Sequence, residues 1–147
     1  MKTFIRPLHL SDLPQIQAIE GATQVAPWAQ ESFLLCFESG YPSWVLELDG
    51  KIIGFIILVL QVDECHILNL AVATPYQHQG LGQQLLLQGI EYSRAEHAMV
   101  IYLEVRCSNT RAVRLYQKIG FQQIGERKDY YRVLQQHEDA LVLAKYL

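Results

Sequence analysis

One stretch of the chain constrains its fold more than any other. An apolar run at residues 67–72 is followed by two closely spaced glycines, Gly80 and Gly82, and then by a second apolar segment. This order predicts a strand, a turn and a helix that begins near Gly80. The two glycines allow the backbone to approach a ligand closely, and the first amides of a helix have no partner inside it. Such a turn suits a phosphate or pyrophosphate group.

Two common phosphate-binding turns fit this stretch poorly. A Walker loop carries Lys followed by Ser or Thr after its last glycine, whereas Gln83 follows Gly82. A dinucleotide fingerprint needs a third small residue three positions later, where Leu85 stands. On residue types alone, a plain turn that only eases the start of a helix therefore remains an alternative.

The composition predicts a single domain over residues 1–147, because 147 residues of which 50% are hydrophobic can build one core. The net charge of -3 argues against nucleic acid as a direct partner, since non-specific binding depends on clustered Lys and Arg. The N-terminus lacks the apolar stretch of a secretory signal, and the most apolar segment, residues 52–60, is too short to cross a membrane. We therefore expect a cytoplasmic protein without a membrane partner.

The cysteines and histidines do not indicate a metal site. Cys36, Cys65 and Cys107 are an odd set without C-x-x-C spacing, which favours reduced thiols over a disulfide framework. The five histidines are scattered and lack the paired spacing of a zinc site. No metal is expected.

The pattern along the chain predicts one α/β domain with seven strands and four helices. Ser11 is expected to cap the first helix, with Pro14 in its first turn, and Asp49-Gly50 predicts a type I′ hairpin turn. The expected strands cover residues 3–6, 43–48, 51–62, 65–72, 99–105, 121–129 and 139–145. The other three helices are expected at residues 30–38, after Gly80, and at residues 109–119.

Two of these strands are expected to form a parallel pair. The runs at residues 67–72 and 100–105 are almost continuously apolar and are joined through a helix, a pattern typical of parallel strands buried on both faces. The glycine turn then lies at the carboxyl end of the first strand, where α/β sheets usually bind ligands.

Two separated motifs resemble those of the GNAT acetyltransferase superfamily. Its acyl-coenzyme A loop has the form Arg/Gln-x-x-Gly-x-Gly/Ala, and this chain has Gln77-x-x-Gly80-x-Gly82. A second signature of that superfamily resembles the segment Asn109-x-x-Ala112-x-x-Leu115-Tyr116-x-x-x-Gly120-Phe121. The resemblance implies the GNAT fold, in which helices flank a single mixed sheet, and acetyl-CoA as co-substrate.

The C-terminal half is further similar to the ribosomal-protein alanine N-acetyltransferase branch, at Leu103-Glu104-Val105-Arg106 and around Tyr130-Tyr131. This similarity implies that the acetyl group passes to the amine of an N-terminal alanine. It also implies that the partner, a ribosomal protein, carries that alanine. We expect a monomer or a weak dimer. A small amine or a lysine side chain as acceptor, and a non-catalytic acyl-CoA sensor, remain alternative functions.

The resemblance assigns two catalytic roles, because in this family the amine attacks the thioester directly without an acyl-enzyme. Glu104 matches the base, and its place within an apolar strand predicts a desolvated carboxylate that accepts protons near neutral pH. The alternative is a strand-end glutamate that reaches solvent or pairs with Arg106 or Arg127. Tyr116 matches the general acid for the leaving thiolate; the alternative is a core tyrosine.

The resemblance also assigns the residues that bind acetyl-CoA. Asn109 has an alternative role as a helix cap, and the absence of arginine at positions 77–79 predicts modest affinity for coenzyme A. The expected cofactor-binding residues are Leu70, Ala71, Val72, Gln77, His78, Gln79, Gly80, Leu81, Gly82, Gln83 and Asn109.

Aromatic side chains are the candidates for the groove that receives the acceptor peptide, because aromatic walls can grip a small apolar first residue. Trp28, Tyr130 and Tyr131 are the predicted substrate-binding residues, and Tyr41 is a weaker candidate. For each of them, packing in the core or on the surface is the alternative.

Overall fold

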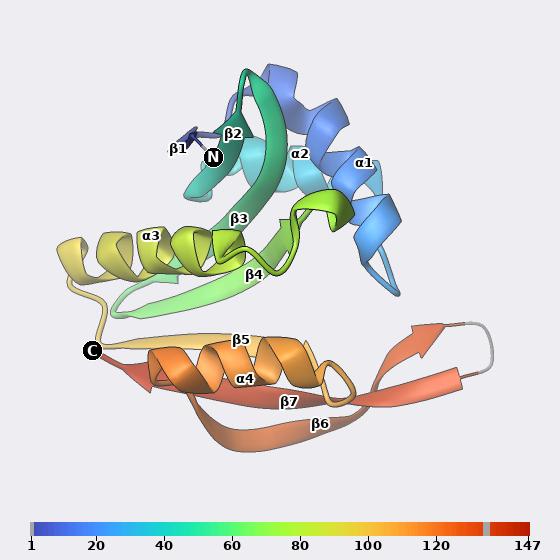
Figure 1. Ribbon diagram of the computed structural model, residues 1–147. Helices are drawn as coiled ribbons and strands as arrows, with labels where there is room; N and C mark the ends of the chain where they lie inside the picture. The colour runs from blue at the N-terminus through green and yellow to red at the C-terminus, as the bar shows by residue number, and fades with distance from the viewer. Residues whose placement is uncertain (1, 134–135) are drawn as a thin grey trace.

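Seven strands form one sheet in the order β1-β2-β3-β4-β5-β7-β6 in the computed structural model, which describes residues 2–133 and 136–147 (Figure 1). Side chains at positions 132, 133 and 136 lie outside the description. The strands are β1 (Thr3–Pro7), β2 (Ser43–Leu48), β3 (Lys51–Gln61), β4 (Glu64–Val72), β5 (Val100–Arg106), β6 (Gln122–Val133) and β7 (Gln136–Tyr146). The helices are α1 (Leu13–Thr23), α2 (Gln30–Glu38), α3 (Leu81–Ala95) and α4 (Thr110–Ile119), with short 3-10 turns η1 (Leu10–Asp12) and η2 (Thr74–Tyr76).

Local sequence explains how the strands connect. Asp49 and Gly50 have φ angles of 51° and 77°, the two positive values that a type I′ turn requires, and they join β2 to β3 as predicted. β4 and β5 are parallel and are connected through α3, whereas all other neighbours in the sheet are antiparallel. The expected α/β fold with one mixed sheet is thereby confirmed.

The helices cover the two faces of the sheet. On one face the apolar side of α3, including Leu85 and Leu86, packs in a core that also contains Tyr116 of α4. On the other face Ile16 of α1 and Phe33 of α2 pack in a second core. The sheet is therefore buried on both sides, which accounts for its long apolar runs.

The centre of the sheet opens between β4 and β5. The two strands pair from Glu64–Val100 to Ile67–Leu103, and beyond that point they diverge (Figure 1). Within the described residues, the rest of β4 pairs only with β3. The backbone groups of β4 that face β5 are therefore left for a ligand beyond Ile67.

A β-bulge lies where the two strands separate. β3 pairs Ile57 with Asn69 and Leu58 with Ile67, so Leu68 is an extra residue in β4. Before the bulge, Ile67 faces the α3 core; after it, Leu70 faces that core and Ala71 faces the α1 core. The bulge therefore decides which side chains of β4 border the opening.

Two local predictions are wrong. Ser11 does not cap the first helix: a 3-10 turn comes first, α1 begins at Leu13, and its flanking residue is Asp12. The Asp12 carboxylate instead accepts hydrogen bonds from the His9 amide and from Arg6. The last two strands are also longer than expected, so that Tyr130 and Tyr131 belong to β6 rather than to a loop.

Cys36 and Cys65 are buried, Cys107 is exposed, and all three are free thiols as predicted. Among the described residues, the helices are all too short or too polar to span a membrane.

Candidate functional site

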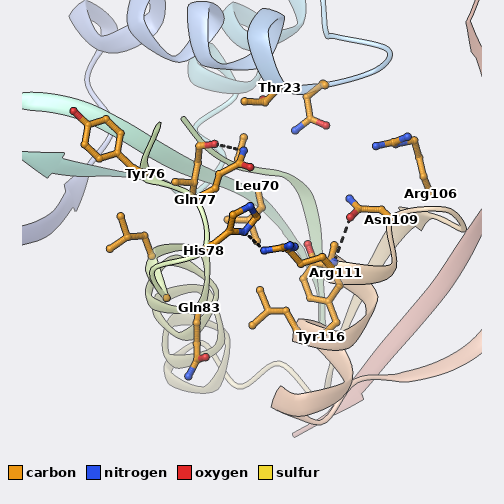
Figure 2. Close-up of a pocket in the computed structure, with 18 residues that line it drawn as sticks. Thr23, Leu70, Tyr76, Gln77, His78, Gln83, Arg106, Asn109, Arg111 and Tyr116 are labelled. Atoms are coloured by element: carbon orange, nitrogen blue, oxygen red, sulfur yellow. Dashed lines mark hydrogen bonds between the residues drawn. The ribbon is translucent and has the colours of Figure 1, made fainter. Parts of the chain in front are cut away.

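A cavity of about 460 Å³ lies where β4 separates from β5, between the N-terminal ends of α3 and α4 (Figure 2). β4 contributes one wall, the turn before α3 a second and the first turns of α4 a third. The C-terminal end of α1 and Arg106, at the end of β5, complete the lining. Its residues are Thr23, Gln24, Leu70, Ala71, Val72, Tyr76, Gln77, His78, Gly80, Leu81, Gly82, Gln83, Arg106, Asn109, Arg111, Ala112, Leu115 and Tyr116.

The glycine turn borders this cavity with its backbone. Gly80 precedes α3 with a φ of 81°, a left-handed conformation that glycine adopts without the steric cost of a Cβ. A Cβ at Gly82 would lie 3.9 Å from both Leu115 and Val72, which line the cavity, so glycine keeps this space open. The first amides of α3 have no partner within the helix and carry the positive end of its dipole. These amides are groups that could hold an anion.

Nearly all of the predicted cofactor-binding residues border this cavity. Gln79 is the exception, because it does not contribute to the lining. The side chain of Gln77 donates a hydrogen bond of 2.8 Å to the Val72 carbonyl and so ties the turn to the end of β4. The Asn109 side chain accepts one of 3.3 Å from the Ala112 amide, so Asn109 caps α4 and also lines the cavity.

A cation that the sequence analysis missed lies beside the glycine turn. Arg111, in the first turn of α4, donates a hydrogen bond to Nδ1 of His78, and both side chains line the cavity (Figure 2). His78 has a positive φ of 66°, which is uncommon for a residue with a side chain. Helix α4 therefore supplies the positive charge that positions 77–79 lack.

A second cavity, of about 190 Å³, adjoins the first on the side of the α1–α2 loop. Both cavities are lined by Leu70, Asn109 and Tyr116. The second is otherwise bordered by α1, the following loop, β4, β5 and β6. The two cavities therefore adjoin beside Tyr116. The residues of the second cavity alone are Glu20, Val25, Ala26, Trp28, Ile67, Leu68, Asn69, Leu103, Glu104, Val105 and Tyr131.

Tyr116 lies at the junction of the two cavities. Its side chain is buried, and burial, followed by the neighbouring Tyr131, raises the pKa of Tyr116 to about 12. Within the part of the chain that the structure describes, its hydroxyl makes no hydrogen bond. Tyr116 therefore presents a protonated hydroxyl to the space that both cavities share.

Glu104 lines the second cavity, but its surroundings differ from those expected. The carboxylate is not desolvated: the side chain is 29% exposed, and Oε1 accepts a hydrogen bond of 2.7 Å from Arg127. Side chains alternate along β5, so Leu103 and Val105 are buried while Glu104 lies on the more open face. The apolar sequence of β5 led us to expect a buried Glu104, but only the face that carries Leu103 and Val105 is buried.

The predicted acceptor-side aromatics separate into two groups. Trp28 and Tyr131 line the second cavity, and burial raises the pKa of Tyr131 to about 12. Tyr130 does not line it; its ring packs against the Arg127 guanidinium and the edge of Tyr131. Tyr41 packs against the core between the sheet and helices α1 and α2, away from both cavities.

Several residues that border the cavities gave no usable signal in the sequence. Thr23 and Gln24 end α1, and Glu20 lies on its buried side; only the tertiary fold brings α1 over the opening between β4 and β5. Arg106 borders both cavities and pairs with Glu138 at 3.6 Å. Among residues 2–133 and 136–147, no three His, Cys, Asp or Glu side chains are grouped to hold a metal ion.

Comparisons with known proteins agree on one family. The model of the acetyltransferase (GNAT) family matches residues 6–121. The [ribosomal protein bS18]-alanine N-acetyltransferase of Escherichia coli K12 is 34% identical over 95% of both chains, and the putative enzyme of that name from Bacillus subtilis is 34% identical over 97% of this chain and 94% of its own. The crystal structure of the ribosomal-protein-S18-alanine N-acetyltransferase from Escherichia coli superposes with a TM-score of 0.93 at 33% identity, over 99% of this chain and 94% of that one. The chain therefore belongs to the acetyltransferase (GNAT) family.

Proposed function

We propose that this protein transfers the acetyl group of acetyl-CoA to the α-amine of an N-terminal alanine, and that the acceptor is a ribosomal protein. The observation that carries this proposal is that two adjoining cavities share Tyr116 in their lining, so that a donor in one and an acceptor in the other would lie next to each other. The names of relatives that align over nearly the whole chain support the choice of acceptor. A ribosomal-protein acceptor would place the enzyme in the cytoplasm, as the sequence predicts.

The first cavity has the features that acetyl-CoA requires. The amides at the start of α3, together with Arg111, provide donors for its pyrophosphate. The free edge of β4 from Leu70 to Val72 offers backbone groups to the pantetheine arm, and an amide near Leu70 serves as donor to the oxygen of the reacting carbonyl. Bound acetyl-CoA supplies the thioester that the acceptor amine attacks.

Glu104 is the proposed base on the acceptor side. An α-amine is largely protonated near neutral pH and must lose a proton before it can attack. Glu104 lines the second cavity, which we propose receives the acceptor and call the acceptor cavity. Its side chain is 29% exposed, so a water molecule can relay the proton to this carboxylate. The role that the sequence predicts is thus kept, with a solvated carboxylate instead of a desolvated one.

Tyr116 is the proposed general acid. The departing thiolate needs a proton donor, and a hydroxyl with a pKa of about 12 is protonated throughout the neutral range. Its position in the lining of both cavities supports this role. No covalent acyl-enzyme is required, because both ligands reach the same point.

Acetyl transfer to three short peptides tests this proposal. One peptide begins with alanine, a second is identical but has a blocked amine, and a third offers only a lysine amine. We expect mass spectrometry to find acetyl on the free alanine amine alone. Acetylation of the lysine peptide instead would favour a lysine acceptor, and binding of acetyl-CoA without product on any amine would favour a sensor.

A further inference from the structure

The loop between α1 and α2, residues 24–29, forms one wall of the acceptor cavity. Gln24, Val25, Ala26 and Trp28 all contribute to the lining. The opposite wall includes Asn69 and Leu70 of β4. The space open to the first residue of an acceptor peptide therefore depends on how this loop is held relative to β4.

A single buried carboxylate joins the loop to the strand. Glu20 of α1 is only 2% exposed, its Oε2 accepts a hydrogen bond of 2.9 Å from the Trp28 amide, and its Oε1 accepts one of 2.9 Å from Nδ2 of Asn69. Burial raises the pKa of Glu20, and the two hydrogen bonds act in the opposite direction. Both partners thus stabilise a charge whose burial alone would be unfavourable.

The partner on β4 adjoins the residue that borders both cavities. Asn69 follows the bulge at Leu68 and lies 9% exposed on the α1 side of the sheet. Leu70 comes next and faces the α3 side, where it packs against the core that contains Tyr116. A restraint on Asn69 therefore also restrains the backbone at Leu70, where the proposed donor to the carbonyl oxygen lies.

We propose that Glu20 is a positioning residue that sets the width of the acceptor cavity and thereby the preference for a small first residue. It holds the Trp28 backbone and the Asn69 side chain at a fixed separation, so the loop and β4 enclose a narrow space. This inference rests on the proposed function. Without the carboxylate the loop is released from β4, and larger first residues gain access while alanine loses its close contacts.

Steady-state kinetics with two peptides that differ only in their first residue, alanine or leucine, test this role. For Glu20→Ala we expect the KM for the alanine peptide to rise about tenfold and the preference for alanine in kcat/KM to fall about tenfold. The KM for acetyl-CoA stays within about twofold, because Glu20 does not line the first cavity.

Two further variants and a control distinguish the positioning role of Glu20 from a general effect on folding. Glu20→Gln should retain the wild-type preference, because Asn69 can turn its side-chain amide and accept a hydrogen bond from the introduced amide through its oxygen. Asn69→Ser removes one of the two bonds and should lower the preference partway, even where loss of the carboxylate impairs folding. Glu38→Ala changes an exposed carboxylate of α2 outside both cavities and should behave as wild type.

The outcomes separate this inference from the proposed function. A preference for alanine that is unchanged in Glu20→Ala and Asn69→Ser would overturn it. An equal loss of kcat on both peptides with that preference unchanged would indicate a purely structural role and would overturn it as well. A wild-type enzyme that acetylates neither peptide would overturn the proposed function itself. A preference for alanine that is lost in Glu20→Ala but retained in Glu20→Gln would establish the positioning role.

Discussion

Arg127 of β6 donates a hydrogen bond of 2.7 Å to Oε1 of Glu104 on β5, two strands away in the sheet. The pair lies partly in solvent, with 53% of the arginine and 29% of the glutamate side chain exposed. Exposed ion pairs contribute little to stability, because the charges are screened and the side chains lose freedom. The pair therefore orients the carboxylate at the edge of the acceptor cavity more than it holds the sheet together.

Replacing Glu104 tests its role as the base. Glu104→Gln keeps the size of the side chain and removes its ability to accept a proton, so we expect turnover to fall by about 10² while acetyl-CoA still binds. Stopped-time assays with an Ala-initiated peptide measure the loss. Glu126→Gln, which changes another ion-paired carboxylate outside both cavities, is the matched control. Near-normal turnover in Glu104→Gln would rule out the role.

Replacing the partner of this carboxylate should have a much smaller effect. Arg127→Gln removes the charge but leaves a side chain that can still donate to Glu104, so we expect turnover to change by less than about threefold. Thermal unfolding should show little change as well, because the pair is exposed. A loss as large as that of Glu104→Gln would mean that the reaction depends on the charge of Arg127, directly or through its bond to Glu104.

Tyr116→Phe removes the hydroxyl and preserves the ring packing against Phe121. We expect turnover to fall by about 10² with nearly unchanged acetyl-CoA binding, because only the proton donor is lost. Since burial raises the pKa of Tyr116 to about 12, the hydroxyl stays protonated below that value. The wild-type rate should therefore not decline between pH 7 and 10 through ionisation of Tyr116. A decline in that range that the Phe variant lacks would mean that the pKa of Tyr116 is lower than its burial implies, whereas near-normal turnover in Tyr116→Phe would rule out its role as the acid.

Much of the fold could be predicted because local sequence determines it. Asp49-Gly50 imposes a hairpin turn, Gly120 ends α4 with a φ of 110°, and the apolar runs at β4 and β5 indicate a buried parallel pair. The borders of the last hairpin were less predictable. The expected strands stop at residue 129 and resume at residue 139, whereas β6 runs to Val133 and β7 begins at Gln136. Tyr131 pairs with Glu138 beyond a register shift that follows Arg127, and such a shift breaks the alternation that marks a strand in the sequence.

The residues of the site also differ in whether local sequence predicts where they lie. The glycine turn and Tyr116 belong to contiguous motifs, so their places in the cavity could be expected from sequence. The ion-pair partner of Glu104 comes from a strand two places away in the sheet. Glu20 reaches the second cavity only because α1 packs against β4, a contact between segments far apart in the chain. No local pattern carries such information.

Arg111 gives the cofactor side its own test. It lies beside the glycine turn and bonds to His78, and positions 77–79 contain no arginine, so it is the cation expected to meet the pyrophosphate. Arg111→Gln should weaken acetyl-CoA binding about tenfold, and the remaining affinity should depend less on salt, because one charge-assisted hydrogen bond is lost. Isothermal titration at two salt concentrations measures both effects. Arg114→Gln, on an exposed position of the same helix outside the cavity, should bind as wild type does. Equal losses in both variants would show that the general charge of α4, and not the position of Arg111, attracts the cofactor.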